Sequence, residues 1–145
     1  MTISRKAEYA LRAVVILAAA APDRPMQIHD LAESGKIPAK FLEQILLTLK
    51  RGGLLRSKRG VGGGYHLEKP ARQITVGDIV ALIDGGLCHL AAHGQDSGTA
   101  EFPGARGLRD SLTEIDELVN EKLASLTIEE ILNRDEPDAM LAFGI

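Results

Sequence analysis

The sequence predicts a mainly α-helical protein with one small β-hairpin, and three observations lead to that fold class. Several segments repeat apolar residues at the i, i+3, i+4, i+7 spacing of an amphipathic helix. Two of these segments are joined by a short turn that holds Gly35. Two short apolar runs then flank a glycine-rich tip from Lys58 to Gly64, which is the pattern of a hairpin. Together these elements predict a winged helix-turn-helix domain, followed by a long helix further along the chain.

The composition allows one compact domain, with or without an appendage, and divides the charge unevenly. The 145 residues are 45% hydrophobic but only 3% aromatic, so aliphatic side chains must fill the core. Residues 1–75 carry 13 Lys and Arg against 6 Asp and Glu, a net charge of +7. Residues 76–145 carry 4 against 14, a net charge of −10. A basic half joined to an acidic half fits nucleic-acid binding on one side, and the acidic half need be no more than a solvated face.

The single cysteine, Cys88, excludes an intrachain disulfide and therefore a secreted disulfide scaffold. Glu8 and Arg12 interrupt the apolar run near the start of the chain, which does not fit a signal peptide. No apolar run reaches the roughly 18 residues that a membrane span needs. We therefore expect a soluble cytoplasmic protein with no membrane partner.

The first two helices follow directly from apolar spacing and capping residues. Ser4 is expected to cap the first helix by accepting a hydrogen bond from a backbone N–H. One face of that helix holds six apolar residues: Ala7, Ala10, Leu11, Val14, Val15 and Ala18. Pro22 and Pro25 end it. A second, short helix containing Ile28, Leu31 and Ala32 is expected to stop at Gly35.

The third helix carries apolar residues at Leu42, Ile45, Leu46 and Leu49, with Pro38 tolerated in its first turn. In a helix-turn-helix, this helix would enter the major groove of DNA. An ordinary helical hairpin in a bundle would produce the same pattern, so both interpretations stay open on this evidence.

The hairpin follows Gly52-Gly53, with strands predicted over 54–57 and 65–68. Its four tip glycines permit positive φ and close backbone approach: Gly60, Gly62, Gly63 and Gly64. The pattern is neither a dinucleotide fingerprint nor a P-loop. No Asp or Glu occurs from Gln44 through Leu67, although that span holds five cations. A helix followed by a basic hairpin predicts a surface for a polyanion, whereas a flexible hairpin without a ligand is the alternative.

The remaining segments are predicted to form a loop and three helices. Thr75 and Asp78 resemble a capping box at the start of a fourth helix. Helical spacing then disappears until residue 107, and a loop of this length usually has a function or is disordered. The long helix carries Leu108, Leu112, Ile115 and Val119 at coiled-coil-like spacing. Thr127 and Glu130 cap a final short helix. A dimer through the long helix is expected, because DNA-binding modules of this size usually act in pairs.

These elements divide the chain into four predicted parts. Residues 1–83 form the DNA-binding domain and 84–107 a sensor-type loop. Residues 108–126 form the dimerisation helix, and 127–145 a short helix with a tail.

With these elements in place, the chain resembles the bacterial winged-helix regulators that include IscR, NsrR and CymR. The matching pieces are SRKAEYALRAV, FLEQIL with TLKRGGLL, the wing RGVGGGY and TVGDIVALIDG, which cover most of residues 2–85. The resemblance implies a homodimeric, sequence-specific transcription regulator that acts as a repressor on double-stranded DNA. The third helix would enter the major groove and the wing the adjacent minor groove.

The resemblance also assigns residues. Arg59 matches a wing arginine that contacts DNA, and Glu43 matches a recognition-helix residue that helps to discriminate bases. Glu43 would accept from a base such as cytosine, unless it is a surface charge paired with Lys40 or Lys50. The candidate DNA-binding residues lie on the third helix and wing: Lys40, Glu43, Gln44, Thr48, Lys50, Arg51, Lys58, Arg59 and Gly60. The candidate dimerisation residues are Leu108, Leu112, Ile115 and Val119.

The cysteine count departs from the iron–sulfur members of that family, which carry three cysteines in the loop before the dimerisation helix. Only Cys88 is present here, so we expect no cluster and no other cofactor. Glu8 occupies the place of a non-cysteine ligand in some relatives. A metal or redox sensor built on Cys88, His89 and His93 is an alternative, and a packed small cysteine is another.

Two other classes of function are weighed against DNA binding. Some cluster-free relatives are governed by binding a metabolic enzyme, so a regulatory protein partner is an alternative that the acidic half would suit. An enzyme is not expected, because no paired carboxylates, nucleophile–base pair or phosphate loop occurs at a recognisable spacing.

Overall fold

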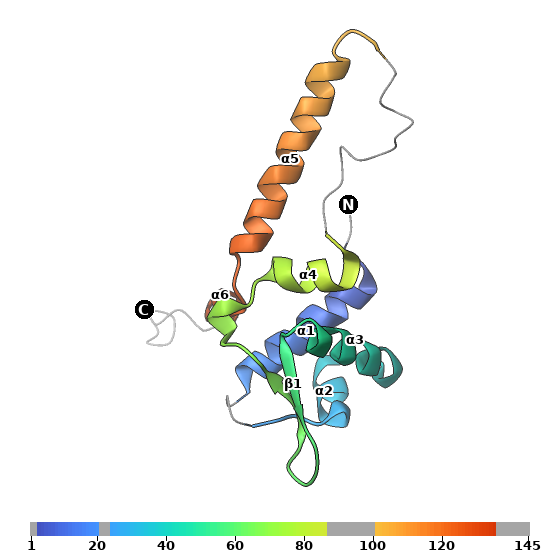
Figure 1. The fold of residues 1–145 in the computed structure, drawn as a ribbon. Coiled ribbons are helices and arrows are strands. Elements are labelled where there is room, and N and C mark those ends of the chain that lie inside the picture. Colours follow the sequence, from blue (N-terminus) through green and yellow to red (C-terminus); the bar gives the residue numbers. More distant parts are fainter. Residues whose placement is uncertain (1–2, 21–23, 87–100, 136–145) are drawn as a thin grey trace, which may run out of the picture.

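A computed structural model describes residues 3–20, 24–86 and 101–135 of the chain. Its elements in chain order are α1 (Arg5–Ala19), α2 (Ile28–Gly35), α3 (Ala39–Arg51), β1 (Leu55–Lys58), β2 (Gly64–Leu67), the 3₁₀ turn η1 (Ala71–Gln73), α4 (Val76–Asp84), α5 (Ala105–Ser125) and α6 (Ile128–Asp135). Figure 1 shows α5 extending away from a body formed by the other elements. The predicted fold class, mainly α-helical with one hairpin in a winged helix-turn-helix, is confirmed.

Helix α1 is the centre of the body and contacts α2, α3, α4 and α6. Its N-cap is Ser4, whose hydroxyl oxygen accepts from the Ala7 backbone N–H at 3.0 Å. The buried face differs from the predicted one. It consists of Ala7, Ala10, Ala13, Val14 and Leu17, whereas Leu11, Val15 and Ala18 are only partly buried. Alanines let neighbouring backbones approach closely, so the small residues of α1 lie at the crowded centre.

The turn between α2 and α3 ends differently from the prediction. Gly35 is still helical, and Lys36 takes the left-handed conformation, with φ 52° and ψ 48°. A Cβ on Gly35 would lie 2.9 Å from the Cδ1 atoms of Ile16 and Ile37, so a larger residue there would displace the ends of these two side chains. Pro38 precedes α3 as its N-cap and is not in its first turn.

One side of helix α3 packs into the hydrophobic core. Its four predicted apolar residues, Leu42, Ile45, Leu46 and Leu49, are all 0% exposed. Burying a side chain of this size contributes about 1.5–3 kcal/mol. Packing therefore fixes both the position of α3 and which of its faces points to solvent.

The hairpin pairs Leu55 with Leu67 at its base and Lys58 with Gly64 near its tip. Each strand is displaced by one residue from the predicted bounds. The segment before α2 adds a further pairing, because the Met26 and Tyr65 backbones exchange N–H···O bonds of 2.9 and 2.8 Å. The hairpin is thus attached to the helix-turn-helix.

Helices α4 and α6 begin with the predicted reciprocal caps. Thr75 and Asp78 exchange two hydrogen bonds of 3.0 Å, and Thr127 and Glu130 exchange bonds of 3.3 and 3.1 Å. The chain before α4 also pairs with the junction of α5 and α6. The Val76 N–H donates to Leu126 O at 2.9 Å. These bonds fix the C-terminal end of α5 to the body.

Helix α5 starts at Ala105, earlier than the predicted Leu108, with Gly104 as its N-cap at φ 93°. Ala105 is its only buried residue. The apolar stripe is present on one helix but uncovered within the chain: Leu108 is 52% exposed and Ile115 43%, while Leu112 and Val119 are partly exposed. Among the described residues, no helix is long and apolar enough to cross a membrane.

Candidate nucleic-acid interface

The solvent-facing side of α3 is set by the core packing on its other side. Lys40, Gln44, Leu47 and Arg51 follow the i, i+4, i+7, i+11 spacing of one helical stripe, and all four are exposed. Glu43 and Lys50, on one flank of the stripe, are exposed as well. The structure therefore brings these predicted residues onto one surface, together with Leu47, which was not among them.

Two hydrogen bonds limit what Thr48 and Lys50 can do. The Thr48 hydroxyl donates to the Gln44 backbone carbonyl at 3.0 Å, within the same helix. The Lys50 Nζ donates to the Ser57 Oγ at 2.6 Å, which connects the end of α3 to β1. Lys50 therefore lies between the helix and the wing rather than extending freely from α3.

The wing tip presents Lys58, Arg59 and Gly60 to solvent. Its turn is closed by the Gly63 N–H, which donates to Gly60 O at 3.0 Å. A Cβ on Gly63 would lie 2.3 Å from Lys58 O, so this tight loop accepts only glycine there. The backbone thus holds the two cations at the end of a narrow projection.

One cation of the acid-free span is neutralised by a residue just outside it. Arg56 Nε and Nη2 donate to the two Glu68 carboxylate oxygens at 2.5 and 2.8 Å. This hydrogen bond lowers the pKa of Glu68 below its ordinary value and raises the pKa of Arg56. Arg56 is accordingly occupied by its own chain, and the interface depends on the other cations.

Those other cations have no such partner. Within residues 3–20, 24–86 and 101–135, no ion pair within 4.0 Å involves Lys50, Arg51, Lys58 or Arg59. Glu43 likewise forms no ion pair with Lys40 or Lys50 in this part of the chain. The surface is therefore a basic face that contains one unpaired carboxylate.

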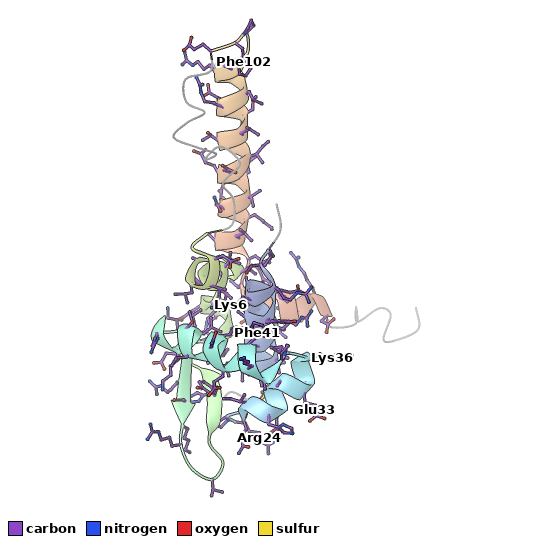
Figure 2. All side chains as sticks on the ribbon, turned by 90° about the vertical axis from the view of Figure 1, so that its right-hand side faces the viewer. Lys6, Arg24, Glu33, Lys36, Phe41 and Phe102 are labelled. Carbon is purple, nitrogen blue, oxygen red and sulfur yellow. The ribbon has the colours of Figure 1, made fainter. Side chains whose placement is uncertain are left out.

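An aromatic pair lies beside this face and was not predicted. The rings of Tyr9 on α1 and Phe41 on α3 are 6.4 Å apart, and the Arg12 guanidinium lies 5.4 Å from the Tyr9 ring centroid. Figure 2 shows Phe41 in the body, whereas Phe102 lies at the far end of α5. Phe41 is 53% exposed. This exposure could have been inferred from the sequence, because position 41 falls outside the apolar stripe of α3.

The predicted sensor residues Cys88, His89 and His93 lie outside the described residues. Glu8 is engaged in an ion pair with Arg12, at 2.7 Å between Oε1 and Nη2. In the part of the chain that the structure describes, no three His, Cys, Asp or Glu side chains are grouped to hold a metal ion.

Comparisons with known proteins agree with this geometry. Residues 3–134 match the family model described as "Rrf2: Iron-dependent Transcriptional regulator". The HTH-type transcriptional regulator IscR of Pectobacterium atrosepticum is 30% identical over 137 residues, covering 94% of this chain and 82% of the relative. The structure of CymR, the global cysteine regulator of B. subtilis, has a TM-score of 0.78 at 29% identity, covering 94% of this chain and 99% of that one.

Two further relatives extend the comparison. The T. potens IscR structure has a TM-score of 0.74 at 25% identity, covering 98% of this chain and 96% of that one. A candidate HTH-type transcriptional regulator of Mycobacterium tuberculosis, MT1325, is 42% identical over 103 residues. That match covers 71% of this chain and 62% of the mycobacterial protein.

Proposed function

Because the chain belongs to the Rrf2 family of transcriptional regulators, we propose that it is a homodimeric, sequence-specific DNA-binding repressor without an iron–sulfur cluster. The observation that carries this proposal is the set of exposed cations on α3 and the wing that form no ion pair within the described residues. In each copy, α3 lies in the major groove and the wing reaches the adjacent minor groove.

The electrostatics of this face favour a phosphate backbone. The exposed cations Lys40, Arg51, Lys58 and Arg59 are available to it, whereas Lys50 donates to Ser57 and Arg56 is paired with Glu68. Each phosphate that a cation neutralises releases counterions and adds about 0.9 to the slope of log affinity against log salt. Glu43 is the exception on this face, and its carboxylate is suited to accept from a cytosine amino group.

The apolar stripe of α5 supports the homodimer. Leu108 and Ile115 of this stripe are 52% and 43% exposed, and Leu118 on its flank is 60% exposed, on a helix that is fixed to the body near its C-terminal end. A stripe of this length is covered efficiently by the same stripe on a second copy. Two copies would present two α3 helices to two half-sites, as sequence-specific dimers do.

The cluster-free part of the proposal rests on the donor set of the chain. An iron–sulfur cluster is held mainly by cysteine thiolates, and the sequence contains one cysteine. Glu8, the residue of α1 that could replace a thiolate, is paired with Arg12. These residues do not fit a cluster, and regulation is assigned instead to Cys88 or to a protein partner.

DNA binding is tested first. Duplexes enriched from a random pool by the full chain are titrated from about 50 to 200 mM salt, and the expected slope exceeds that of a single contact. Arg59→Ala should lower the slope by about 1 per copy. Arg134→Ala, which removes an exposed arginine from α6, should leave it unchanged. Absence of DNA binding, or affinity independent of salt, contradicts the proposal.

The cluster assignment is tested separately. Protein isolated without oxygen should show no charge-transfer absorption in the visible range and no stoichiometric iron or sulfide. A brown protein with equal amounts of iron and sulfide would contradict this part and leave the DNA-binding part intact.

A further inference from the structure

Leu47 is an apolar residue in the middle of the basic face. It is 42% exposed, and it shares the central stripe of α3 with Lys40, Gln44 and Arg51. The core packing fixes this orientation, because Ile45 and Leu49 on the opposite side are 0% exposed. Leu47 therefore points in the direction in which α3 would meet DNA.

The surroundings of Leu47 argue against a protein interface at this position. Its neighbours one helical turn away, Glu43, Gln44, Lys50 and Arg51, are all polar and exposed. Leu47 is thus a single apolar side chain in a charged surface. A docking surface for another protein would be expected to continue over several apolar residues, as the stripe of α5 does.

The chemistry of the major groove gives an isolated leucine one favourable partner. Guanine, adenine and cytosine present hydrogen-bonding atoms along their edges, whereas thymine adds a C5-methyl group. A leucine placed over an amino or carbonyl group would remove water without replacing the hydrogen bond, which costs free energy. Over a methyl group, the same contact removes two apolar surfaces from water.

We propose that Leu47 is a specificity-determining residue that packs against a thymine C5-methyl group in each half-site. This inference rests on the proposed function, since it requires α3 to lie in the major groove. It divides the reading of bases between an apolar contact at Leu47 and polar contacts from Gln44 and Glu43 on the same face.

The test removes the methyl group from the DNA and the side chain from the protein in turn. Each thymine of the duplex enriched by the wild-type chain is replaced singly by deoxyuridine, which lacks only the C5-methyl. Wild-type affinity should fall about four-fold at one position of each half-site, the effect of losing one buried methyl-sized group. Leu47→Ala should bind the thymine and uracil duplexes equally at that position.

Phe41→Ala is the matched control, because it also shortens an exposed apolar side chain on α3 but lies beside Tyr9 and outside the central stripe. It should retain the uracil penalty. Circular dichroism and thermal unfolding check that each variant stays folded, as expected for alanine in a helix.

Two results overturn the inference while the proposed function stands: no uracil penalty at any thymine, or an equal penalty for the wild type and Leu47→Ala at every thymine. Failure of the wild-type chain to enrich any duplex is a different result. It removes the proposed function, and the inference with it.

Discussion

Helices α3 and α5 are both amphipathic, but the chain covers the apolar face of α3 and leaves that of α5 exposed. The stripe of α3 is 0% exposed at all four positions within a single chain. The stripe of α5 is open to solvent, with Leu108 at 52% and Ile115 at 43%. Similar periodicity in the sequence therefore leads to a buried face in one helix and to an uncovered face in the other.

The difference shows for which helix a single chain is enough to cover the apolar face. The body covers α3 with residues from α1, α2, α4 and the hairpin, so that only its polar side remains for a ligand. Helix α5 is attached near its C-terminal end and has only Ala105 buried. Its apolar side remains for a partner, which we propose is a second copy.

The largest expected effect comes from making the α5 stripe charged. Leu112→Glu combined with Ile115→Glu places four carboxylates in the interface of two copies. Because each buried apolar side chain is worth about 1.5–3 kcal/mol, dimerisation should weaken on the order of 1,000-fold or more. Sedimentation velocity should show monomers with a folded body, and DNA affinity should fall with the loss of paired half-sites.

Thr113→Glu provides the matched control for this experiment. Thr113 is exposed on the acid-rich side of α5, so a carboxylate added there should leave the dimer intact. A double variant that stays dimeric would place the interface outside the α5 stripe.

A smaller effect is expected from two adjacent leucines of α3. Leu46 is 0% exposed and Leu47 is 42% exposed. Leu46→Ala should lower the free energy of unfolding by about 2–5 kcal/mol, because it leaves a cavity in the core. Leu47→Ala should change it by less than about 0.5 kcal/mol. Urea unfolding at one fixed protein concentration measures both, and equal effects would contradict the assignment of the two faces.

Much of the body could be predicted from the sequence because its signals are local. The caps at Ser4, Thr75 and Thr127 were recognised from residue types at fixed offsets, and the structure confirms their hydrogen bonds. The core stripe of α3 was predicted correctly for the same reason. Helical spacing states which residues share a face.

The remaining features depend on distant packing. Lys36 rather than Gly35 is left-handed, and a Cβ at position 35 would crowd the Cδ1 atom of Ile16 on α1, a distant contact that the local sequence does not reveal. The buried face of α1 is displaced toward Ala13 and Leu17 by its several neighbours. Leu47 is not among the predicted DNA-binding residues, because apolar periodicity identifies the buried stripe of a helix and does not assign a role to an apolar residue on its polar side. The DNA-binding and dimerisation residues themselves stay predictions.

A substitution in the turn between α2 and α3 is expected to stabilise the body that contains α3. Lys36 is the only non-glycine residue with positive φ among the described residues, at 52°. Lys36→Gly should raise the free energy of unfolding by about 0.5–1 kcal/mol, since relief of left-handed strain exceeds the added freedom of the unfolded chain. Lys36→Ala keeps the strain and removes the charge, so it should show no gain. A gain in both variants would assign the effect to the charge instead.

The smallest expected effect concerns the ion pair that withdraws Arg56 from the basic face. Arg56 lowers the pKa of Glu68 from its ordinary value of 4.5, and the neighbouring His66 adds a weaker lowering. A carboxyl whose pKa is lower in the folded state stabilises the fold above the unfolded pKa, and this contribution is lost as pH falls through the folded pKa. Glu68→Gln should therefore reduce the loss of thermal stability as the pH falls below about 5. The change should be small, because the two side chains are 63% and 35% exposed and water screens the pair.

Arg56→Gln removes the same pair from the other side and should reduce the acid-side loss similarly, measured as Tm against pH. If Glu68→Gln responds and Arg56→Gln does not, Glu68 owes its acid-side contribution to another group, and Arg56 returns to the cations available for DNA.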